Sequence, residues 1–114
     1  MAETIFSKII RKEIPAHIVY ESETILAFKD ISPKAPQHIL VIPKTEIRSL
    51  VEAKQEHKEL LGEMLLVCSE IARSLGLDQK GFRVVVNSGA EAGQTVFHLH
   101  MHILGGRPMN WPPG

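Results

Sequence analysis

The sequence has little cysteine, no surplus of charge of either sign and no long hydrophobic run. Its 114 residues include one cysteine, Cys68, which can form neither an internal disulfide nor a cysteine metal cluster. Lysine and arginine together number 13, as do aspartate and glutamate, so the formal net charge is zero. This balance argues against a nucleic-acid partner, because phosphate backbones are held by an excess of basic side chains. It also favours self-association.

The absence of long apolar runs bears on where the protein works. No stretch approaches the roughly 20 apolar residues that a membrane-spanning helix needs. The first ten residues also lack the apolar run of a signal peptide. We therefore expect a cytoplasmic protein without a membrane partner. The length is close to that of one ordinary domain, so we expect a single domain over residues 1–114.

Hydrophobic periodicity predicts two helices and five strands. Helical spacing predicts a short helix over residues 6–14 and a long helix over about residues 54–75, stopped by Pro15 and Gly76 respectively. β-Branched runs predict strands over residues 18–22, 25–29, 38–43, 82–87 and 96–104. Strands joined by short loops indicate an antiparallel sheet carrying helices, which is an α+β domain.

The long helix has a predicted apolar face that packs on a core. Its members are Leu60, Leu61, Met64, Leu65, Cys68, Ile71, Ala72 and Leu75. Because free cysteine is often buried, we interpret Cys68 as a core residue rather than a nucleophile. His17 and His57 have no such pattern around them, and we interpret both as solvated surface residues.

Three of the six histidines alternate along the last predicted strand. Because successive side chains of a strand point to opposite faces, His98, His100 and His102 are predicted to share one face. The apolar residues at positions 97, 99, 101 and 103 then point the other way. Three imidazoles offer little to a hydrophobic core, so we favour a functional site over an exposed polar face or three separately hydrogen-bonded histidines.

Two chemistries suit these histidines. Neutral imidazole is a common zinc ligand. However, neighbours two apart on a strand are separated by roughly 6.6 Å, so a zinc site would need two of the three plus a further ligand such as His38. Alternatively, a histidine acts as nucleophile, acid or base near neutral pH. The preceding Gly93, Gln94 and Thr95 can bring backbone N–H groups and a hydroxyl towards an anion. The second combination suits phosphoryl or nucleotidyl transfer without a metal.

The histidine-rich segment resembles the signature of the histidine-triad family. Residues 98–104 read His-Leu-His-Met-His-Ile-Leu and match the pattern His-φ-His-φ-His-φ-φ, with φ apolar, at every position. The resemblance extends over nearly the whole chain, through residues 5–15, 30–33, 35–36, 38, 41–44, 85–87, 93–94 and 104–107. With Trp-Pro-Pro-Gly at residues 111–114, the chain resembles the Hint branch, the histidine triad nucleotide-binding proteins.

This resemblance implies a fold, an activity and a partner. The fold would be a five-stranded antiparallel sheet with one long and one short helix, pairing across a two-fold axis into a ten-stranded dimer sheet. The activity would be that of a nucleoside phosphoramidase, which hydrolyses adenosine or guanosine 5′-phosphoramidates to an amine and the nucleoside monophosphate. The ligands would be AMP, GMP or their phosphoramidates, and no metal or other cofactor is implied.

The resemblance also implies roles for individual catalytic residues. His100 would be the nucleophile that attacks the α-phosphorus and forms a nucleotidyl-histidine. His98 and His102 would flank the phosphate, and His38 would support the histidine network. Thr95 would contact the phosphate or the leaving group. Many relatives have serine at that position, so the extra methyl group bears on leaving-group preference.

The implied nucleotide site has three parts. Asp30 would accept hydrogen bonds from the ribose hydroxyls, and its alternative role is a turn before Ser32. The base pocket would be lined by apolar residues, each of which could equally be core: Ile5, Phe6, Ile9, Ile14, Phe28 and Ile31. The phosphate pocket would comprise Asn87, Gly93, Gln94, Thr95, Val96, His100 and His102.

The C-terminal tail, residues 104–114, contains the single tryptophan, Trp111. By resemblance the tail reaches the partner subunit's active site and shapes leaving-group specificity, whereas the alternative is a tail anchored by one aromatic residue. Three other functions stay open: a dinucleoside polyphosphate hydrolase or nucleotidyltransferase of another branch, a non-catalytic nucleotide-binding scaffold, and a zinc-dependent enzyme.

Overall fold

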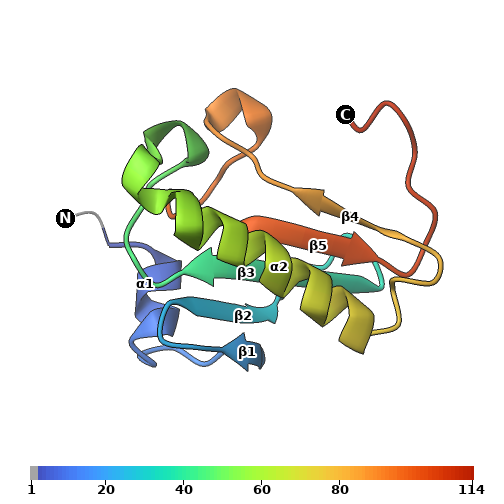
Figure 1. The fold of residues 1–114 in the computed structure, drawn as a ribbon, viewed down its shortest axis with the longest axis horizontal. Helices are drawn as coiled ribbons and strands as arrows, with labels where there is room; N and C mark the ends of the chain where they lie inside the picture. The colour runs from blue at the N-terminus through green and yellow to red at the C-terminus, as the bar shows by residue number, and fades with distance from the viewer. Residues whose placement is uncertain (1–2) are drawn as a thin grey trace.

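The computed structural model in Figure 1 describes residues 3–114. Residues 1 and 2, the first two of the predicted domain, lie outside the described residues. The elements are α1 (Ile5–Ile10), β1 (Ile18–Glu21), β2 (Ile25–Lys29), β3 (Gln37–Pro43), α2 (Lys58–Ser74), β4 (Phe82–Val85) and β5 (Met101–Gly105). Short 3-10 helices cover Leu50–Glu52, Gln55–His57 and Ala90–Ala92. The predicted α+β class and the predicted order of helices and strands are confirmed.

The strands form one antiparallel sheet in the order β1-β2-β3-β5-β4. The central strand β3 pairs with β2 from Ile25↔Pro43 to Lys29↔Ile39, and with β5 from Gln37↔Gly105 to Val41↔Met101. β1 and β4 are the edges of the sheet. From Glu3 onward, no helix combines the length and the apolar character that crossing a membrane requires.

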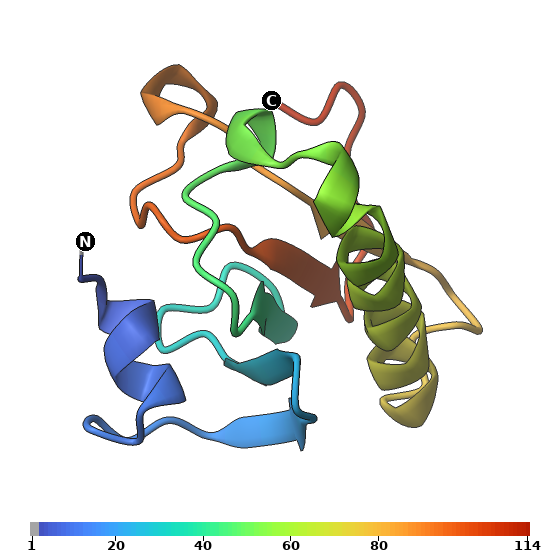
Figure 2. The same cartoon turned by 60° about the vertical axis from the view of Figure 1, so that its left-hand side comes forward.

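The two helices cover opposite faces of the sheet, as Figure 2 shows. Under α2, Met64, Cys68 and Ile71 pack against sheet residues that include Ile39 and Ile103. Cys68 is buried as predicted, and burial raises the pKa of its thiol to about 11, which keeps it protonated. A smaller apolar cluster lies between α1 and the other face: Phe6, Ile9, Leu26, Phe28, Leu40 and Ile42.

Both helices are shorter than predicted. α1 ends at Ile10 because Lys12 adopts a left-handed φ of 62°. α2 begins at Lys58 because residues 55–57 form a 3-10 turn, in which the Lys54 N–H donates to His57 Nδ1 at 2.9 Å. The prediction that His57 is a solvated surface residue is wrong, because its side chain is only 17% exposed. The predicted stop at Gly76 is confirmed by its φ of +75°.

The predicted apolar face of α2 is wrong at Leu65, which is 53% exposed beside Leu66 at 67%. Val67 is buried in its place. A helix turns by roughly 100° per residue, so Leu65 falls beyond the edge of the stripe that Met64, Cys68 and Ile71 define. The two leucines leave an apolar patch on the side of α2 that is turned away from the sheet.

The last strand is also shorter than predicted, since it begins at Met101 rather than Val96. β3 stops pairing with it at Val41, and the segment before Met101 bonds elsewhere. There the Leu99 N–H donates to the Ile47 carbonyl at 2.7 Å. Of the three triad histidines only His102 lies in a strand, so the prediction that all three share one strand face is wrong. β4 likewise ends at Val85 and β1 at Glu21, while β3 starts one residue early, at Gln37.

Candidate active site

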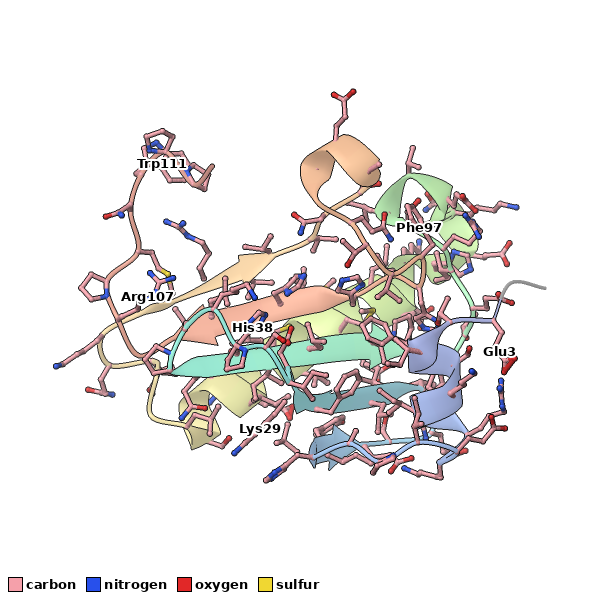
Figure 3. The ribbon with its side chains drawn as sticks, turned by 180° about the vertical axis from the view of Figure 1, so that it is seen from behind. Glu3, Lys29, His38, Phe97, Arg107 and Trp111 are labelled. Carbon is pink, nitrogen blue, oxygen red and sulfur yellow. The ribbon has the colours of Figure 1, made fainter. Side chains whose placement is uncertain are left out.

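Four histidines, His38, His98, His100 and His102, lie near one another and near Phe6 of α1. Figure 3 labels His38, on the face of the sheet that α2 does not cover. The ring centroids of His100 and His102 are 4.9 Å apart, and those of His38 and His102 are 5.2 Å apart. The edge of the Phe6 ring meets His100 with 5.0 Å between centroids. His38 comes from β3 and His102 from β5, and the irregular path before β5 brings His100 beside them.

His100 presents an unprotonated ring nitrogen. Its Nδ1 lies 2.7 Å from the carbonyl oxygen of His98. Because a carbonyl only accepts hydrogen bonds, Nδ1 carries the proton and the lone pair of the neutral ring is on Nε2. Burial lowers the pKa of His100 against the opposing effect of that hydrogen bond, which keeps the ring neutral at pH 7. A neutral imidazole in this tautomer is prepared to act as a nucleophile.

His102 presents the opposite group, a ring N–H. The Lys34 N–H donates to His38 Nδ1 at 3.0 Å, so the proton of the neutral His38 ring is on Nε2. That Nε2–H donates to His102 Nδ1 at 2.9 Å, which leaves the proton of His102 on Nε2. Within residues 3–114 this Nε2 is buried and has no hydrogen-bond partner. An unsatisfied buried donor costs about 1–3 kcal/mol, a cost that a hydrogen bond to an oxygen atom would remove.

The pKa values of the four histidines are all lowered, chiefly by burial. For His102, repulsion from His100 and His38 adds to burial and lowers the pKa to about 4. Asp30, whose Oδ2 lies 3.5 Å from His38 Nε2, acts in the opposite direction on His38. The network is therefore neutral at pH 7, which is the condition that the hydrogen-bond directions above require.

His98 anchors the segment that carries His100. It is 2% exposed, and its Nε2 lies 2.7 Å from the carbonyl oxygen of Pro43, to which it donates. Together with the bond from Leu99 to Ile47, this contact holds residues 98–100 against the chain that leaves β3. The side chain of His98 thus sets the path of the backbone whose carbonyl orients His100.

A cavity of about 280 Å³ opens beside His100 and His102. One part of its wall is apolar and another carries Asp30, Thr95 and the two histidines, a division that suits a ligand with a planar apolar group and a polar group. The structure brings these predicted residues to its wall: Ile5, Phe6, Ile9, Ile14, Phe28, Asp30, Ile31, Thr95, Val96, His100 and His102.

Sequence reasoning missed four residues of the cavity wall: Pro15, Ala16, Lys29 and Leu40. Leu40 could have been found from strand alternation, because it shares a face of β3 with His38. Lys29 directly precedes Asp30, and only the turn after β2 brings it to the wall.

Other predicted site residues lie outside the cavity wall. The side chain of Gln94 is buried within its loop, where it accepts from the Gly89 N–H and donates to the carbonyls of Arg48 and Val96. Gly93 has a φ of +94°, and a Cβ there would lie 3.8 Å from Asn87 Nδ2. Trp111 is 81% exposed, and the Arg83 guanidinium lies 5.9 Å from its ring centroid. Figure 3 shows Trp111 well apart from His38.

The sequence was compared with protein-family models and with known proteins. The family model of the HIT domain matches residues 11–109. The chain belongs to the HIT family. It is 53% identical over 113 residues to a 14 kDa zinc-binding protein of Zea mays, covering 97% of this chain and 88% of that protein. It is 50% identical over 107 residues to the purine nucleoside phosphoramidase of Escherichia coli strain K12, covering 94% and 90%.

Among solved structures, the HIT family hydrolase from Legionella pneumophila Philadelphia 1 superimposes with a TM-score of 0.96 at 45% identity, covering 98% of this chain and all of that one. The HIT fold inferred from the histidine pattern is thereby confirmed. The matched residues of the HIT domain include the four histidines and Asp30, whereas α1 and Trp111 lie outside the match.

Asp30, His38 and His102 are the ligand-type groups of this HIT-family chain that lie closest together, within 4.8 Å of one another among the described residues. Their hydrogen bonds do not fit a metal ion. A metal-bound histidine normally donates from its second nitrogen, but His38 Nδ1 accepts a hydrogen bond from the Lys34 N–H. If Nε2 also bound an ion, the ring would carry no proton at all. The three groups fit a chain of hydrogen bonds better than a metal site.

Proposed function

We propose that this protein is a purine nucleoside phosphoramidase, which cleaves the P–N bond of adenosine or guanosine 5′-phosphoramidates through a nucleotidyl-histidine. One observation carries the proposal: at the same cavity His100 offers a lone pair on Nε2 and His102 offers an unsatisfied N–H on Nε2. The first suits attack on phosphorus and the second suits a phosphoryl oxygen. The name of the 50% identical relative from Escherichia coli, purine nucleoside phosphoramidase, supports this choice of substrate.

The cavity would orient the nucleotide before any bond changes. The base would lie among the isoleucines and phenylalanines of the apolar wall, with the ribose hydroxyls at Asp30. The Asp30 carboxylate is already oriented, since its Oδ1 accepts from the Ser32 N–H at 2.8 Å and its Oδ2 lies beside His38. The turn role and the ribose role considered for Asp30 are therefore compatible.

The reaction would proceed in two displacements. The lone pair of His100 Nε2 forms a bond to the α-phosphorus while the P–N bond breaks, and its electrons leave with the amine, which takes a proton from water. The His98 carbonyl, accepting from Nδ1–H, stabilises the positive charge that develops on the ring. The His102 N–H donates to a phosphoryl oxygen, a contribution of roughly 3 kcal/mol for a preorganised donor. Water then attacks phosphorus, releasing the monophosphate and restoring His100.

Thr95 is the hydroxyl residue of the cavity wall closest in sequence to the triad. We propose that it holds the leaving nitrogen or a phosphoryl oxygen. Its methyl group adds bulk on that side, which would disfavour large leaving groups near phosphorus.

We further propose that the protein acts as a homodimer joined through β4. This edge strand carries an exposed apolar side chain, since Phe82 is 36% exposed. The other edge strand, β1, also exposes Ile18 and Val19 but ends in a charged residue, Glu21, which pairs with Lys12 and Lys44. Charge on an edge strand discourages strand pairing, and zero net charge does not oppose association.

Light scattering of matched edge variants tests the dimer. Phe82→Glu on β4 should give a monomer, whereas Ile18→Glu on β1, a residue of nearly equal exposure at 37%, should leave a dimer. A monomeric wild type, or a dimer lost in the Ile18 variant alone, would contradict the proposal.

The activity is tested by amine release from an adenosine 5′-phosphoramidate with a chelator present. We expect metal-independent turnover, and samples quenched in denaturant at alkaline pH, where a P–N bond to histidine survives, should contain an adenylyl adduct on the peptide that carries His100. A diadenosine polyphosphate is the matched substrate for the other branch. Faster cleavage of that substrate, or loss of activity with chelator, would overturn the phosphoramidase assignment. AMP binding without turnover of either substrate would make the protein a nucleotide-binding scaffold.

A further inference from the structure

We propose that Arg107 is a positioning residue that sets the tautomer of His38 and, through it, of His102. It would do so by holding the loop between β2 and β3, so that the Lys34 N–H stays aimed at His38 Nδ1. The consequence for turnover rests on the proposed function, whereas the consequence for the tautomers does not.

The contacts form a continuous series from the tail to the cavity. Arg107 Nη2 donates to the Lys34 carbonyl at 2.9 Å. The N–H of the same residue, Lys34, donates to His38 Nδ1 at 3.0 Å. His38 then donates to His102, whose Nε2–H is the unsatisfied donor at the cavity. The backbone of Lys34 is therefore held by two hydrogen bonds, one from Arg107 to its carbonyl and one from its N–H to His38.

The residue before Arg107 also packs closely against this loop. Gly106 has a φ of +94°, and a Cβ added there would lie 2.8 Å from Pro36 Cβ. Only glycine accepts both this φ and this close approach. Since Gln37 pairs with Gly105 at the end of the β3–β5 ladder, the turn at Gly106 brings Arg107 down over residues 34–36.

The position of this loop decides whether His102 Nε2, which faces the cavity, carries a proton or a lone pair. A neutral histidine has two tautomers. Without the Lys34 N–H, His38 can carry its proton on Nδ1 and turn a lone pair towards His102. His102 then places its own proton on Nδ1 to make the bond, and its Nε2 faces the phosphate with a lone pair. The lone pair of His102 Nε2 would then face a phosphoryl oxygen, whereas in the wild type the Nε2–H donates a hydrogen bond to that oxygen.

The test combines histidine side-chain NMR with kinetics on Arg107→Ala. In wild type, long-range ¹H–¹⁵N spectra should show His38 and His102 protonated at Nε2. In the variant, both should shift towards the Nδ1–H tautomer. Turnover of an adenosine 5′-phosphoramidate should fall by roughly 10-fold, because outright loss of such a donor costs on the order of 100-fold or more. KM should change less than kcat.

Two further variants make the test specific. Arg73→Ala is the control, since Arg73 is an arginine of α2 that donates to Ser69 Oγ at 3.2 Å and lies outside this series of contacts. It should keep the wild-type tautomers and rate. Arg107→Lys keeps one donor for the Lys34 carbonyl and should recover part of both.

Each result decides the proposal. Wild-type tautomers in Arg107→Ala, or equal losses of rate in Arg107→Ala and Arg73→Ala, would overturn it. Altered tautomers with an unchanged rate would overturn the link to turnover. If the wild-type protein cleaves no phosphoramidate, the proposed function fails, and the NMR comparison still decides whether Arg107 sets the tautomers.

Discussion

The two faces of the sheet are built for different purposes. Under the 17-residue α2, 14 buried apolar residues form one continuous core. Under the six-residue α1, only six do so, and the remaining space holds the histidines and the cavity. A short helix leaves part of a sheet face uncovered. Apolar packing is therefore concentrated on the face under α2, and the other face can hold polar side chains.

The central strand supplies both faces at once. Ile39 and Val41 of β3 belong to the core under α2, whereas Leu40 belongs to the cluster under α1, on the same side as His38. β5 repeats the arrangement, with Met101 and Ile103 in the core and His102 on the other side. A strand buried in a core on one side is a rigid support for the reactive groups on the other.

The largest expected effect comes from removing the nucleophile on the α1 face. His100→Ala should lower kcat by at least about 10⁴-fold, while AMP binding changes by only a few-fold. Steady-state kinetics and calorimetry measure the two quantities, with the exposed His17→Ala as the control variant. Substantial turnover by the His100 variant would refute the assignment of the nucleophile.

A core truncation on the α2 face should have the next largest effect. Met64 is fully buried, so Met64→Ala should lower the free energy of unfolding by about 2–5 kcal/mol. The AMP affinity of the folded protein should not change. Ile14→Ala, a half-buried wall residue of the cavity, should do the reverse, weakening AMP binding with little loss of stability. Urea unfolding and calorimetry measure stability and AMP affinity for both variants. If Met64→Ala weakened AMP binding and Ile14→Ala lowered stability, the division of roles between the two faces would be wrong.

The ribose contact should have a smaller effect on binding. Asp30→Asn keeps the shape of the side chain but removes its charge, and hydrogen bonds to a charged group contribute about 1.5–3 kcal/mol. We expect AMP to bind roughly 10- to 100-fold more weakly. A 2′,3′-dideoxy nucleotide should lose affinity for the wild type and almost none for the variant. Equal losses for both proteins would show that Asp30 does not contact the ribose.

Acid should destabilise the protein through the α1 face. His102 is faced by His38, His100 and Asp30, and its folded pKa of about 4 lies below the ordinary value of 6.5. The unfolded chain therefore binds more protons below pH 6.5, so stability is lost as the pH falls from there. Between about pH 7.5 and 5.5 this histidine alone should lower the free energy of unfolding by about 1.4 kcal/mol. His38, His98 and His100 act in the same direction.

Urea unfolding at the two pH values measures this loss. A His102→Asn variant, which lacks the titrating ring, should show a shallower pH dependence than the wild type. A free energy of unfolding that rises towards acid pH would contradict the neutral network on which the tautomer argument depends.

The smallest expected effect is that of the tail. Truncation after Arg107 should leave the free energy of unfolding nearly unchanged, because most of the removed residues are exposed. If the tail reaches the partner's site, the ratio of rates for alkyl and aryl amine leaving groups should shift by a few-fold. Unchanged relative rates would leave Trp111 the role of a surface anchor beside Arg83.

Much of the fold could be predicted because its signals are local. The order of helices and strands, the stop at Gly76 and the burial of Cys68 follow from periodicity and side-chain size. The histidine pattern likewise indicated the HIT family. Errors arose where a distant backbone group intervened. Leu99 bonds to Ile47 and so shortens β5, and the 3-10 turn around His57 delays α2.

The residue pattern was therefore enough to predict the α+β class, the family and the residue types that carry the chemistry. Which nitrogen of each ring holds a proton depends on the folded chain. That choice depends on the carbonyl of His98 for His100, and on the Lys34 N–H for His38 and His102. The physical reason is that a tautomer follows the hydrogen-bond partners of a ring. His102 takes its partner, His38, from a different strand, and the partners of His38 and His100 are near in sequence but face the rings only because of the path of the folded backbone.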